Sequence, residues 1–435
     1  MTGREIPPVL ALPDVVRSLR LHQSDDVVST FEQIMRSNLT EVARIWDDNS
    51  VFVVTGDIPA MWLRDSAAQL RPYLLLCRDD QALQEVLIGV ARRQLAFLLT
   101  DPYANSFTDG SPSWHADDLT DAGPATWERK FELDSLCFPV EFCYRLWKIT
   151  GRTDFLGTTA HEAFTAAVEV FETEQDHESL SSYSFQRPHA PTTDTLVRNG
   201  KGRRTTPCGL VWSAFRPSDD AVELGYNIPG NMFVNVAAGY IAEMAEKVFS
   251  DTQLATRARE LGRSVRQGIE DHGTVTLPGG KRVFAYETDG AGKHILMDDA
   301  NMPSLLSAPL TYYVTTNDPV YAATREFVLS SSNPYFYAGM QAQGVGSPHT
   351  PRGYVWPIAL AVQGLTAINE AERDAILKTL SSTTGGTGRM HESFDPDHPG
   401  DFTRPWFSWA DAMFCELVLR YADITFSTTS ATTPS

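Results

Sequence analysis

Three acidic residues in loop-like stretches have the chemistry that hydrolysis of a glycosidic bond requires. Asp219 and Asp220 are adjacent, and because neighbouring like charges raise the pKa of one carboxyl, one of them can keep a proton near neutral pH. Glu392 follows a run of glycines that lets the backbone approach a substrate closely. An acid for the leaving oxygen and a carboxylate for water, roughly 6.5–9.5 Å apart, are the working pair of inverting glycosidases. Taken alone, a Ser-Asp-Asp sequence more often caps a helix or turn, and a lone glutamate is more often exposed.

The segment from 55 to 66 gathers residues that suit a sugar-binding site. It follows the β-like run at 51–54 and precedes an apolar, helix-periodic stretch, which predicts a loop on a rigid support. Carboxylates and arginine bond to neighbouring hydroxyl groups, and an indole takes the C–H face of a sugar ring. A buried Arg-Asp pair beside a core tryptophan explains this segment equally well on its own. The residues concerned are Asp57, Trp62, Arg64 and Asp65.

Blocks of this kind recur along the chain. They are Thr55–Ser66, Trp127–Cys137, Phe215–Ala221, Met297–Ser304, Gly346–Thr350 and Gly385–Phe394. In order and spacing they closely resemble glycoside hydrolase family 125, from about residue 27 to about residue 421. That resemblance implies a metal-independent, inverting exo-α-1,6-mannosidase.

The resemblance also implies roles for individual residues. The general acid is one of the adjacent aspartates: we predict Asp219, with Asp220 as the close alternative, and the other would bind sugar or hold Arg216. The general base is Glu392 of the His-Glu-Ser block. The stretch 63–66 is similar to the Arg-Asp-Ser stretch of glucoamylases, whose Arg and Asp hold the sugar being cleaved, so we expect a pocket closed at one end and exo action. Further substrate contacts are expected from Trp127, Arg216, Asn231, Asp299, His349 and His391.

Apolar residues at three- and four-residue steps predict about twelve helices that position these blocks. Ser24 precedes the first helix and is expected to be its N-cap. Short joins favour stacked α-hairpins, and closure of six hairpins into an all-α (α/α)6 toroid is what the family implies. A minor β-hairpin is expected within 273–296. The expected helices cover 28–46, 65–77, 80–99, 132–149, 153–175, 230–248, 252–271, 301–313, 317–331, 354–367, 369–382 and 405–422.

Long segments between the expected helices carry most of the blocks. No internal stretch is rich enough in proline, glycine or serine to mark a domain boundary, so we expect one catalytic domain over 1–426 and a disordered tail over 427–435. Long ordered loops in a compact domain are usually functional. We therefore expect at least two of five tryptophans in or beside the loops and the 55–66 segment to line the site. These are Trp62, Trp114, Trp127, Trp212 and Trp406.

The formal net charge of −19 disfavours nucleic acid and anionic membranes as partners and suits a neutral manno-oligosaccharide. No apolar run approaches the ~20 residues that span a bilayer. The first residues lack the basic and apolar blocks of a signal peptide, and five scattered cysteines fit a reducing compartment. For these two reasons we expect a cytoplasmic protein. We expect it to be a monomer or a weak homo-oligomer.

The sequence predicts neither a metal site nor a cofactor. The acidic and histidine residues around Glu392 lack HExxH or EF-hand spacing, and no phosphate-binding glycine motif is present. Three other functions remain open. A glucoamylase-like exo-α-glucosidase and a glycoside phosphorylase share the fold class, and Arg389 with His391 would begin the phosphate pocket of a phosphorylase. The third is an inactive sugar-binding protein, against which the presence of both carboxylates argues.

Overall fold

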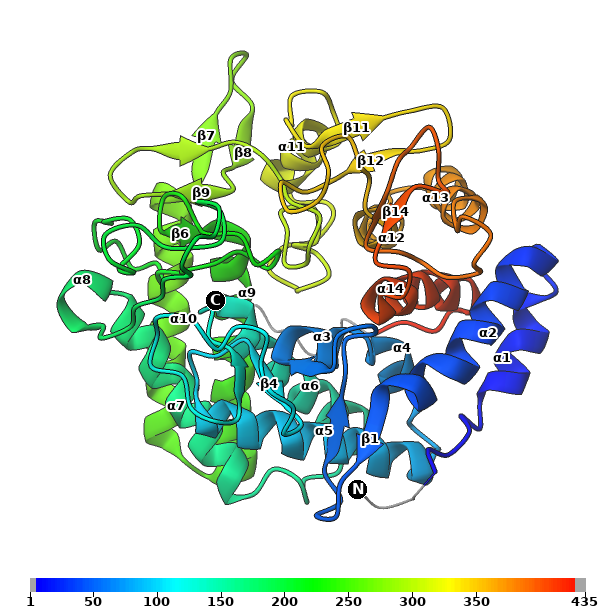
Figure 1. Ribbon diagram of the computed structural model, residues 1–435, viewed down its shortest axis with the longest axis horizontal. Coiled ribbons are helices and arrows are strands. Elements are labelled where there is room, and N and C mark those ends of the chain that lie inside the picture. The colour runs from blue at the N-terminus through cyan, green and yellow to red at the C-terminus, as the bar shows by residue number, and fades with distance from the viewer. Residues whose placement is uncertain (1–4, 427–435) are drawn as a thin grey trace.

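Helices that are buried on nearly every side form the inner wall of a ring (Figure 1). They are α3 (Leu63–Ala68) with α4 (Arg71–Leu76), α6 (Leu133–Thr150), α9 (Ile228–Met244), α12 (Pro357–Leu365) and α14 (Ser408–Leu419). All residues of α14 are buried, which is typical of a helix that is apolar nearly all round. Along the wall α3 contacts α6, α6 contacts α9, and α14 contacts both α12 and α4. The computed structural model describes residues 5–426.

A second set of helices packs around this wall and alternates with it along the chain. The outer helices are α2 (Asp25–Val42), α5 (Gln81–Thr100), α7 (Thr158–Glu174), α10 (Thr252–His272), α11 (Pro319–Val328) and α13 (Glu370–Ser382). They are amphipathic: the buried residues of α10 recur at three- and four-residue steps, including Leu254, Ala258, Leu261, Val265 and Ile269. The alternation of inner and outer helices gives the (α/α)6 toroid.

The helix expected at 301–313 is wrong, because this stretch forms turns where a further inner helix would stand. Pro303 and Pro309 lack the backbone N–H that a helix interior uses. The hydroxyls of Ser304 and Ser307 each accept the other residue's backbone N–H, at 3.1 and 2.8 Å. The Asp298 carboxylate accepts the backbone N–H groups of Leu305 and Leu306 at 2.8 and 2.9 Å. Side-chain hydrogen bonds thus replace helical ones in a segment that is nevertheless buried.

Two other expected helices differ in extent. The helix predicted over 28–46 ends at Val42, because the chain continues into β1 (Ala43–Ile45), which pairs with β2 (Val51–Val53). The helix predicted over 65–77 is divided into α3 and α4. Ser24 is confirmed as the N-cap of α2, since its hydroxyl accepts the Val27 N–H at 3.4 Å. Two short helices were not predicted, α1 (Leu12–Leu19) and α8 (His177–Leu180). The helices predicted over 230–248 and 405–422 end in a π-helical turn (Ala245–Phe249) and a 3-10 turn (Arg420–Ala422).

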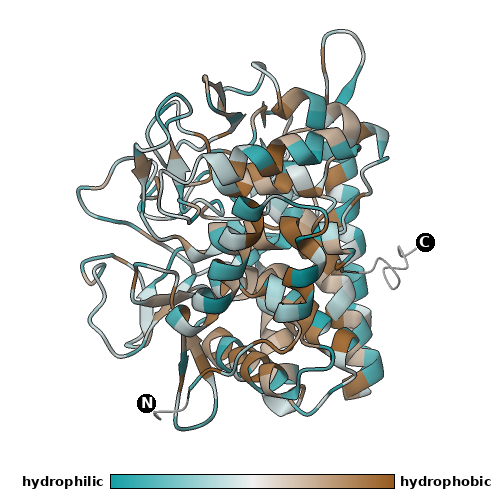
Figure 2. Ribbon diagram, turned by 90° about the vertical axis from the view of Figure 1, so that its right-hand side faces the viewer, coloured by the Kyte–Doolittle hydropathy of each residue, from teal (hydrophilic) through white to brown (hydrophobic). Residues whose placement is uncertain are grey.

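Short strands and long loops gather on one face of the ring, as Figure 2 shows in side view. The expected hairpin is confirmed: β7 (Thr274–Thr276) pairs antiparallel with β8 (Arg282–Phe284). Five further small sheets occur within residues 5–426. Besides β1–β2 they are β3 (Ala60–Trp62) with β4 (Ser106–Thr108) and β5 (Thr126–Glu128), β6 (Tyr226–Asn227) with β9 (Glu287–Thr288) and β10 (His294–Ile295), β11 (Phe336–Ala338) with β12 (Gln343–Val345), and β13 (Ser393–Phe394) with β14 (Phe402–Thr403).

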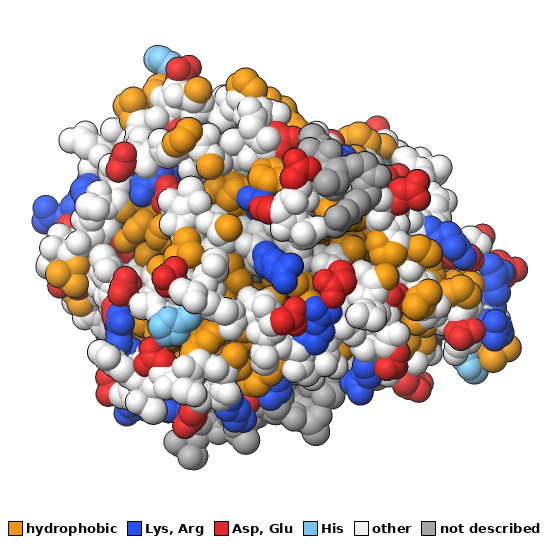
Figure 3. Space-filling view, turned by 90° about the horizontal axis from the view of Figure 1, so that it is seen from below, with side chains coloured by type: hydrophobic (Ala, Val, Ile, Leu, Met, Phe, Trp, Pro, Cys, Tyr) orange, Lys and Arg blue, Asp and Glu red, His pale blue; other side chains and the backbone are white. Residues whose placement is uncertain are grey.

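One hydrophobic cluster extends through the ring, with members from Val9 to Leu419. The tail expected at 427–435 lies outside the described residues. Among residues 5–426, no helix combines the length and the apolarity that crossing a membrane requires. On the face that Figure 3 shows, basic and acidic side chains are interspersed.

Candidate active site

Five of the six blocks singled out in the sequence line one cleft at the ends of the inner helices, and the sixth, Trp127–Cys137, contacts its lining residue Arg64. The cleft encloses about 360 Å³, open solvent at its mouth included. Trp62, Trp356 and Phe407 line it and are the N-cap residues of α3, α12 and α14. Inner helices thus direct their positive dipole ends toward the cleft, which favours carboxylates there. The lining residues are Thr55, Ile58, Trp62, Arg64, Asp65, Ser218, Asp219, Asn301, His349, Trp356, Glu392, Arg404, Phe407 and Trp409.

A buried arginine at the base of α3 holds four carboxyl groups together. Nη1 of Arg64 lies 2.6 Å from Glu132 Oε2 and 3.1 Å from Asp134 Oδ2. Its Nη2 lies 3.2 Å from Asp219 Oδ1, and its Nε lies 3.4 Å from Asp65 Oδ2. The Thr55 hydroxyl donates a hydrogen bond to Asp65 at 2.5 Å. Arg64 therefore organises the acidic side of the cleft.

The carboxyl groups of this cluster have pKa values shifted in opposite directions. Burial disfavours ionised Asp219, but the charges of Arg64, Lys130 and His349 and the neighbouring Glu132 carboxyl together outweigh burial and hold the pKa of Asp219 well below its usual range. The opposite holds for Glu132: burial raises its pKa well above the usual range, against the charge of Arg64. Burial also raises the pKa of Asp134 to about 6. With one guanidinium for four carboxyl groups, protonation of at least one member relieves repulsion in the cluster.

A tight turn sends the two adjacent aspartates in different directions. Asp219 has φ of +67°, in the left-handed region that aspartate tolerates better than most residues. Its N–H donates to the Arg216 carbonyl at 2.9 Å, and the Arg216 N–H donates to the Asp220 carbonyl at 2.7 Å. The Asp219 side chain lines the cleft, whereas that of Asp220 lies beside His349, 3.2 Å from Nδ1. The geometry thus brings Asp219, rather than Asp220, to the cleft surface.

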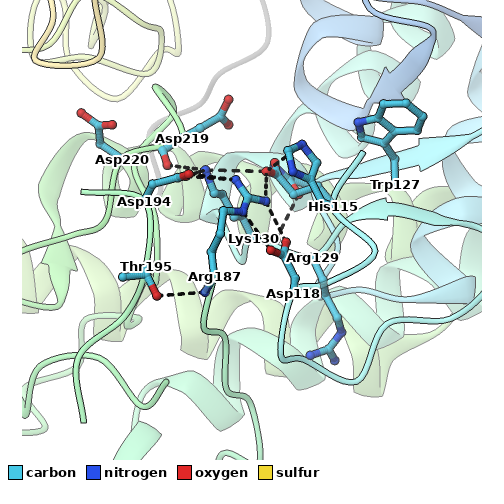
Figure 4. Close-up of polar contacts among 12 residues, drawn as sticks. His115, Asp118, Trp127, Arg129, Lys130, Arg187, Asp194, Thr195, Asp219 and Asp220 are labelled. Atoms are coloured by element: carbon cyan, nitrogen blue, oxygen red, sulfur yellow. Dashed lines mark hydrogen bonds and ion pairs between the residues drawn. The ribbon is translucent and has the colours of Figure 1, made fainter. Parts of the chain in front are cut away.

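A buried network behind this turn fixes its backbone (Figure 4). Nζ of Lys130 donates to the Asp219 carbonyl at 2.9 Å and to Asp194 Oδ1 at 2.5 Å. Arg187 bonds the same Asp194 carboxylate at 3.0 Å and pairs with Asp118 at 2.7 Å. Three loops are therefore tied to the carbonyl of one cleft residue.

His349 carries a positive charge at the cleft. Burial disfavours the imidazolium, but the hydrogen bond and charge of Asp220 outweigh it and raise the pKa of His349 to about 9. At neutral pH the ring therefore has an N–H on each nitrogen. One of them faces Asp220, and the other is available for a hydroxyl or ring oxygen of a ligand.

Glu392 lines the cleft just before β13, with 12% of its side chain exposed. Nη1 of Arg404 lies 3.8 Å from its Oε1. Arg404 is oriented in turn by Asp57, whose Oδ1 accepts from Nε at 2.9 Å, and by the Thr55 carbonyl at 2.7 Å. A carboxylate beside a fixed cation, in the same cleft as Asp219, can activate a water molecule.

This geometry has a counterpart among known proteins. A family model described as metal-independent alpha-mannosidase, glycoside hydrolase family 125, matches residues 24–419. The chain belongs to this family. Within residues 5–426, no three His, Cys, Asp or Glu side chains are grouped so that they could hold a metal ion.

Individual relatives agree with the family match. A metal-independent α-mannosidase of Streptococcus pneumoniae, solved as a non-productive complex with α-1,6-mannobiose, is 44% identical, with a TM-score of 0.93 over 95% of this chain and 97% of the other. The meiotically up-regulated gene 157 protein of Schizosaccharomyces pombe is 38% identical over 421 residues, 91% of this chain and 82% of the other. A bacterial glucoamylase bound to acarbose has a TM-score of 0.59 at 12% identity, over 94% of this chain and 57% of the other, which shows the fold alone. Together they confirm the predicted family and fold.

Several residues expected to touch substrate instead support the family-125 cleft. Asn231 is fully buried, and its amide bonds only backbone: the Val211 N–H and carbonyl at 2.7 and 2.9 Å and the Asn227 carbonyl at 2.9 Å. Arg216 pairs with Glu287 at 2.6 Å. Neither side chain lines the cleft. The expectation that Asn231 and Arg216 contact substrate is therefore wrong, because the polar groups of both side chains bond to other parts of the protein.

Other expected residues act one contact away from the cleft. The His391 ring stacks on Phe402, with 3.6 Å between ring centroids, and its Nε2 lies 3.1 Å from the Thr384 carbonyl, so it orders the loop that bears Glu392. Asp299 accepts the hydroxyl of Ser218, next to Asp219, at 2.7 Å. Trp127 packs against Trp62 and Ala60. Asp57 orients Arg404 through a hydrogen bond. Asp220 contacts His349.

The tryptophan expectation is also wrong. Of the five tryptophans singled out in the sequence, only Trp62 lines the cleft. The other two tryptophans that line it, Trp356 and Trp409, were not singled out. Trp212 is buried and stacks on His177 at 3.6 Å between ring centroids. Trp356 and Trp409 belong to predicted helices, and position on a helix end rather than in a loop brings them to the cleft.

Sequence reasoning also missed Glu132, Asp134 and Arg404. The first two lie in the Trp127–Cys137 block, at the N-cap and second position of α6. Two acids at the start of a helix, in a block already singled out, were the available signal. Arg404 offers no comparable signal, because its role depends on the fold bringing it to Glu392.

Proposed function

We propose that this α-mannosidase is an inverting exo-α-1,6-mannosidase that removes terminal mannose from the non-reducing ends of manno-oligosaccharides or N-glycan fragments. The observation that carries the proposal is the presence of Asp219 and Glu392 in one cleft. The α-1,6 linkage is supported by the 44% identical Streptococcus pneumoniae enzyme, which was captured with α-1,6-mannobiose.

The proposed reaction has two proton movements. Asp219 gives a proton to the glycosidic oxygen while the bond from that oxygen to C1 breaks. Glu392 takes a proton from water, whose oxygen bonds to C1 from the opposite face and forms β-mannose. The excess of carboxylates around Arg64 favours the positive charge that develops on the sugar ring.

The cleft explains why the action would be confined to chain ends. Of the three tryptophans that line the cleft, Trp62 is 6% exposed and can contact a sugar ring, whereas Trp356 and Trp409, at 1% and 0%, support the wall from behind. Arg64, Asp65 and Asp219 line one side of the cleft, where the carboxyl groups are at most a quarter exposed. A terminal residue can enter such a cleft, whereas an internal one would need space on both sides.

A disaccharide panel with product NMR tests the proposal. We expect cleavage of α-1,6-mannobiose, much slower cleavage of the α-1,2 and α-1,3 isomers, and β-mannose as the first product. Comparable turnover of maltose or isomaltose would contradict the specificity. Release of mannose 1-phosphate when phosphate is added would identify a phosphorylase, and α-mannose as first product would mean retention through a nucleophile.

A further inference from the structure

The carboxyl group of Glu132 is placed to share a proton with Asp219. It is fully buried, and its Oε2 accepts from Arg64 Nη1 at 2.6 Å and from Ser135 Oγ at 3.2 Å. No N–H or hydroxyl group of the described residues donates to its Oε1, which is equally buried. Asp219 Oδ1 contacts Nη2 of the same guanidinium at 3.2 Å, so Arg64 holds the two carboxyl groups next to each other. Since ionised carboxylates only accept, a hydrogen bond between these two groups requires a proton on one of them.

The surrounding charges decide which of the two carboxyls carries it. Arg64 contacts both, so it does not distinguish between them. Two further cations, Lys130 and His349, act on Asp219 and favour its ionised form. Glu132 is more deeply buried than Asp219, at 0% against 25% side-chain exposure, and burial disfavours its ionised form. These surroundings favour a proton on Glu132 and a negative charge on Asp219.

This assignment conflicts with a simple view of Asp219 as an acid, because a general acid must have a proton to give. We infer that Glu132 stores the proton that Asp219 delivers to the glycosidic oxygen, so that the two carboxyl groups work as one acid. The inference deepens the proposed mannosidase function and rests on it. Asp219 remains the group that touches substrate, and Glu132 acts through it.

The transfer balances over one turnover. The O–H bond of Glu132 breaks as an O–H bond forms on Asp219. That second bond breaks as the glycosidic oxygen takes the proton and leaves C1. Water supplies the new C1–O bond and gives its proton to Glu392. Afterwards Glu392 releases a proton to solvent, and Asp219 passes one back from solvent to Glu132.

The variant Glu132→Gln tests the inference, because it keeps the length of the side chain and an oxygen for Arg64 but has no acidic proton. We expect kcat on α-1,6-mannobiose to fall by about 10²-fold or more, the usual contribution of general acid catalysis. On an activated aryl α-mannoside, whose leaving group needs little protonation, the loss should stay below about 10-fold. The basic limb of the kcat/KM profile should move to lower pH, since Asp219 alone is the stronger acid.

Asp134→Asn is the matched control. It also removes a buried carboxyl from Arg64, 3.1 Å away, but leaves the Glu132–Asp219 contact in place. Any loss should therefore be similar for both substrates. A second variant, Glu132→Asp, keeps an acidic proton on a shorter side chain and should lose less activity on mannobiose than Glu132→Gln.

The outcomes separate the two claims. If Glu132→Gln lowers kcat equally on both substrates and leaves the pH profile unchanged, Glu132 only orients Arg64. That result would overturn the inference. If Glu132→Gln does not fold, Glu132→Asp decides: a leaving-group-independent loss there overturns it as well. Failure of the wild-type protein to cleave any α-mannoside would instead reject the proposed function.

Discussion

Lys130 donates a hydrogen bond of 2.9 Å to the backbone carbonyl of Asp219, the residue held at φ +67°. Its ammonium also pairs with Asp194 and lies 3.6 Å from Glu128, with 3% of the side chain exposed. Burial disfavours the charged form, but Glu128, Asp219 and Asp194 outweigh burial and raise the pKa of Lys130. The conformation of the proposed acid thus depends on a buried cation from another segment of the chain.

Replacing this cation should harm both stability and activity. Lys130→Met leaves the Asp219 carbonyl without its donor, while Glu128 and Asp194 keep Arg187 at 2.7 and 3.0 Å. We therefore expect the free energy of unfolding to fall by about 1–3 kcal/mol, the cost of a buried acceptor left unsatisfied. Lys148→Met is the control, because Lys148 pairs with Glu243 at 3.0 Å but is 30% exposed, and such surface pairs contribute about 0–1 kcal/mol. Urea unfolding measures both variants, and equal effects would show that the Lys130 network does not stabilise the fold.

The two proposed catalytic carboxyls should respond differently to the leaving group. Asp219→Asn should slow α-1,6-mannobiose far more than an activated aryl α-mannoside, because acid assistance matters most for a basic leaving group. Glu392→Gln should abolish turnover of both, since water activation is needed whatever departs, while binding stays largely intact. Kinetics on both substrates, with calorimetry for binding, provide the measurement. A leaving-group-dependent loss in Asp220→Asn, and none in Asp219→Asn, would assign the acid to the other aspartate.

The His349–Asp220 contact should be visible in a histidine titration. Asp220→Asn removes the carboxylate that raises the pKa of His349 to about 9, so the pKa should fall toward or below 6.5. NMR of the ring C–H signals reports this value directly. An unchanged pKa would mean that another group holds the imidazolium.

The same contact predicts how stability varies with pH. The folded pKa of His349 lies above its unfolded value, so the stabilisation is fully present below about pH 6.5 and is lost as the pH rises through about 9. With 36% of the His349 side chain exposed, solvent screens part of this effect. Denaturant unfolding between pH 6 and 10 should show a decline in wild type that is weaker in Asp220→Asn. Parallel curves for the two proteins would exclude a contribution from this pair.

Chelation should leave activity intact. The described residues offer no metal-holding group of acids, histidines or cysteines, and the family is described as metal-independent. Assays after treatment with EDTA, and after addition of calcium or zinc, test this expectation. A loss with EDTA that either metal restores would mean that a cation takes part in the loop around Glu392.

Periodicity predicted the helices because burial on one face leaves a strong pattern, as in α10 with Leu254 and Leu261. It failed at 301–313, where Ser304 and Ser307 satisfy the backbone with side chains while the segment remains buried and apolar. Hydrophobic spacing reports burial, and it does not show which group accepts each N–H.

The site was predictable where one short block carries its own chemistry, as with Trp62, Arg64 and Asp65. It was not predictable where a role arises from segments far apart in the chain. Arg404 acquires its place beside Glu392 through Asp57, nearly 350 residues earlier. Asn231 was predicted to bind substrate, but its side-chain amide bonds to backbone groups of Val211 and Asn227.

The pairing of Asp57 with Arg404 joins the beginning of the ring to its end, 347 residues apart. Contact between α14 and α2 closes the same seam. The cation that orients Glu392 is thus set in place by the contact that completes the circle, and long-range contacts of this kind form late and slowly in folding. In a chain that is helical but still open, Arg404 is not yet held beside Glu392, the proposed base. Recovery of hydrolysis during refolding therefore reports closure of the ring rather than formation of its helices.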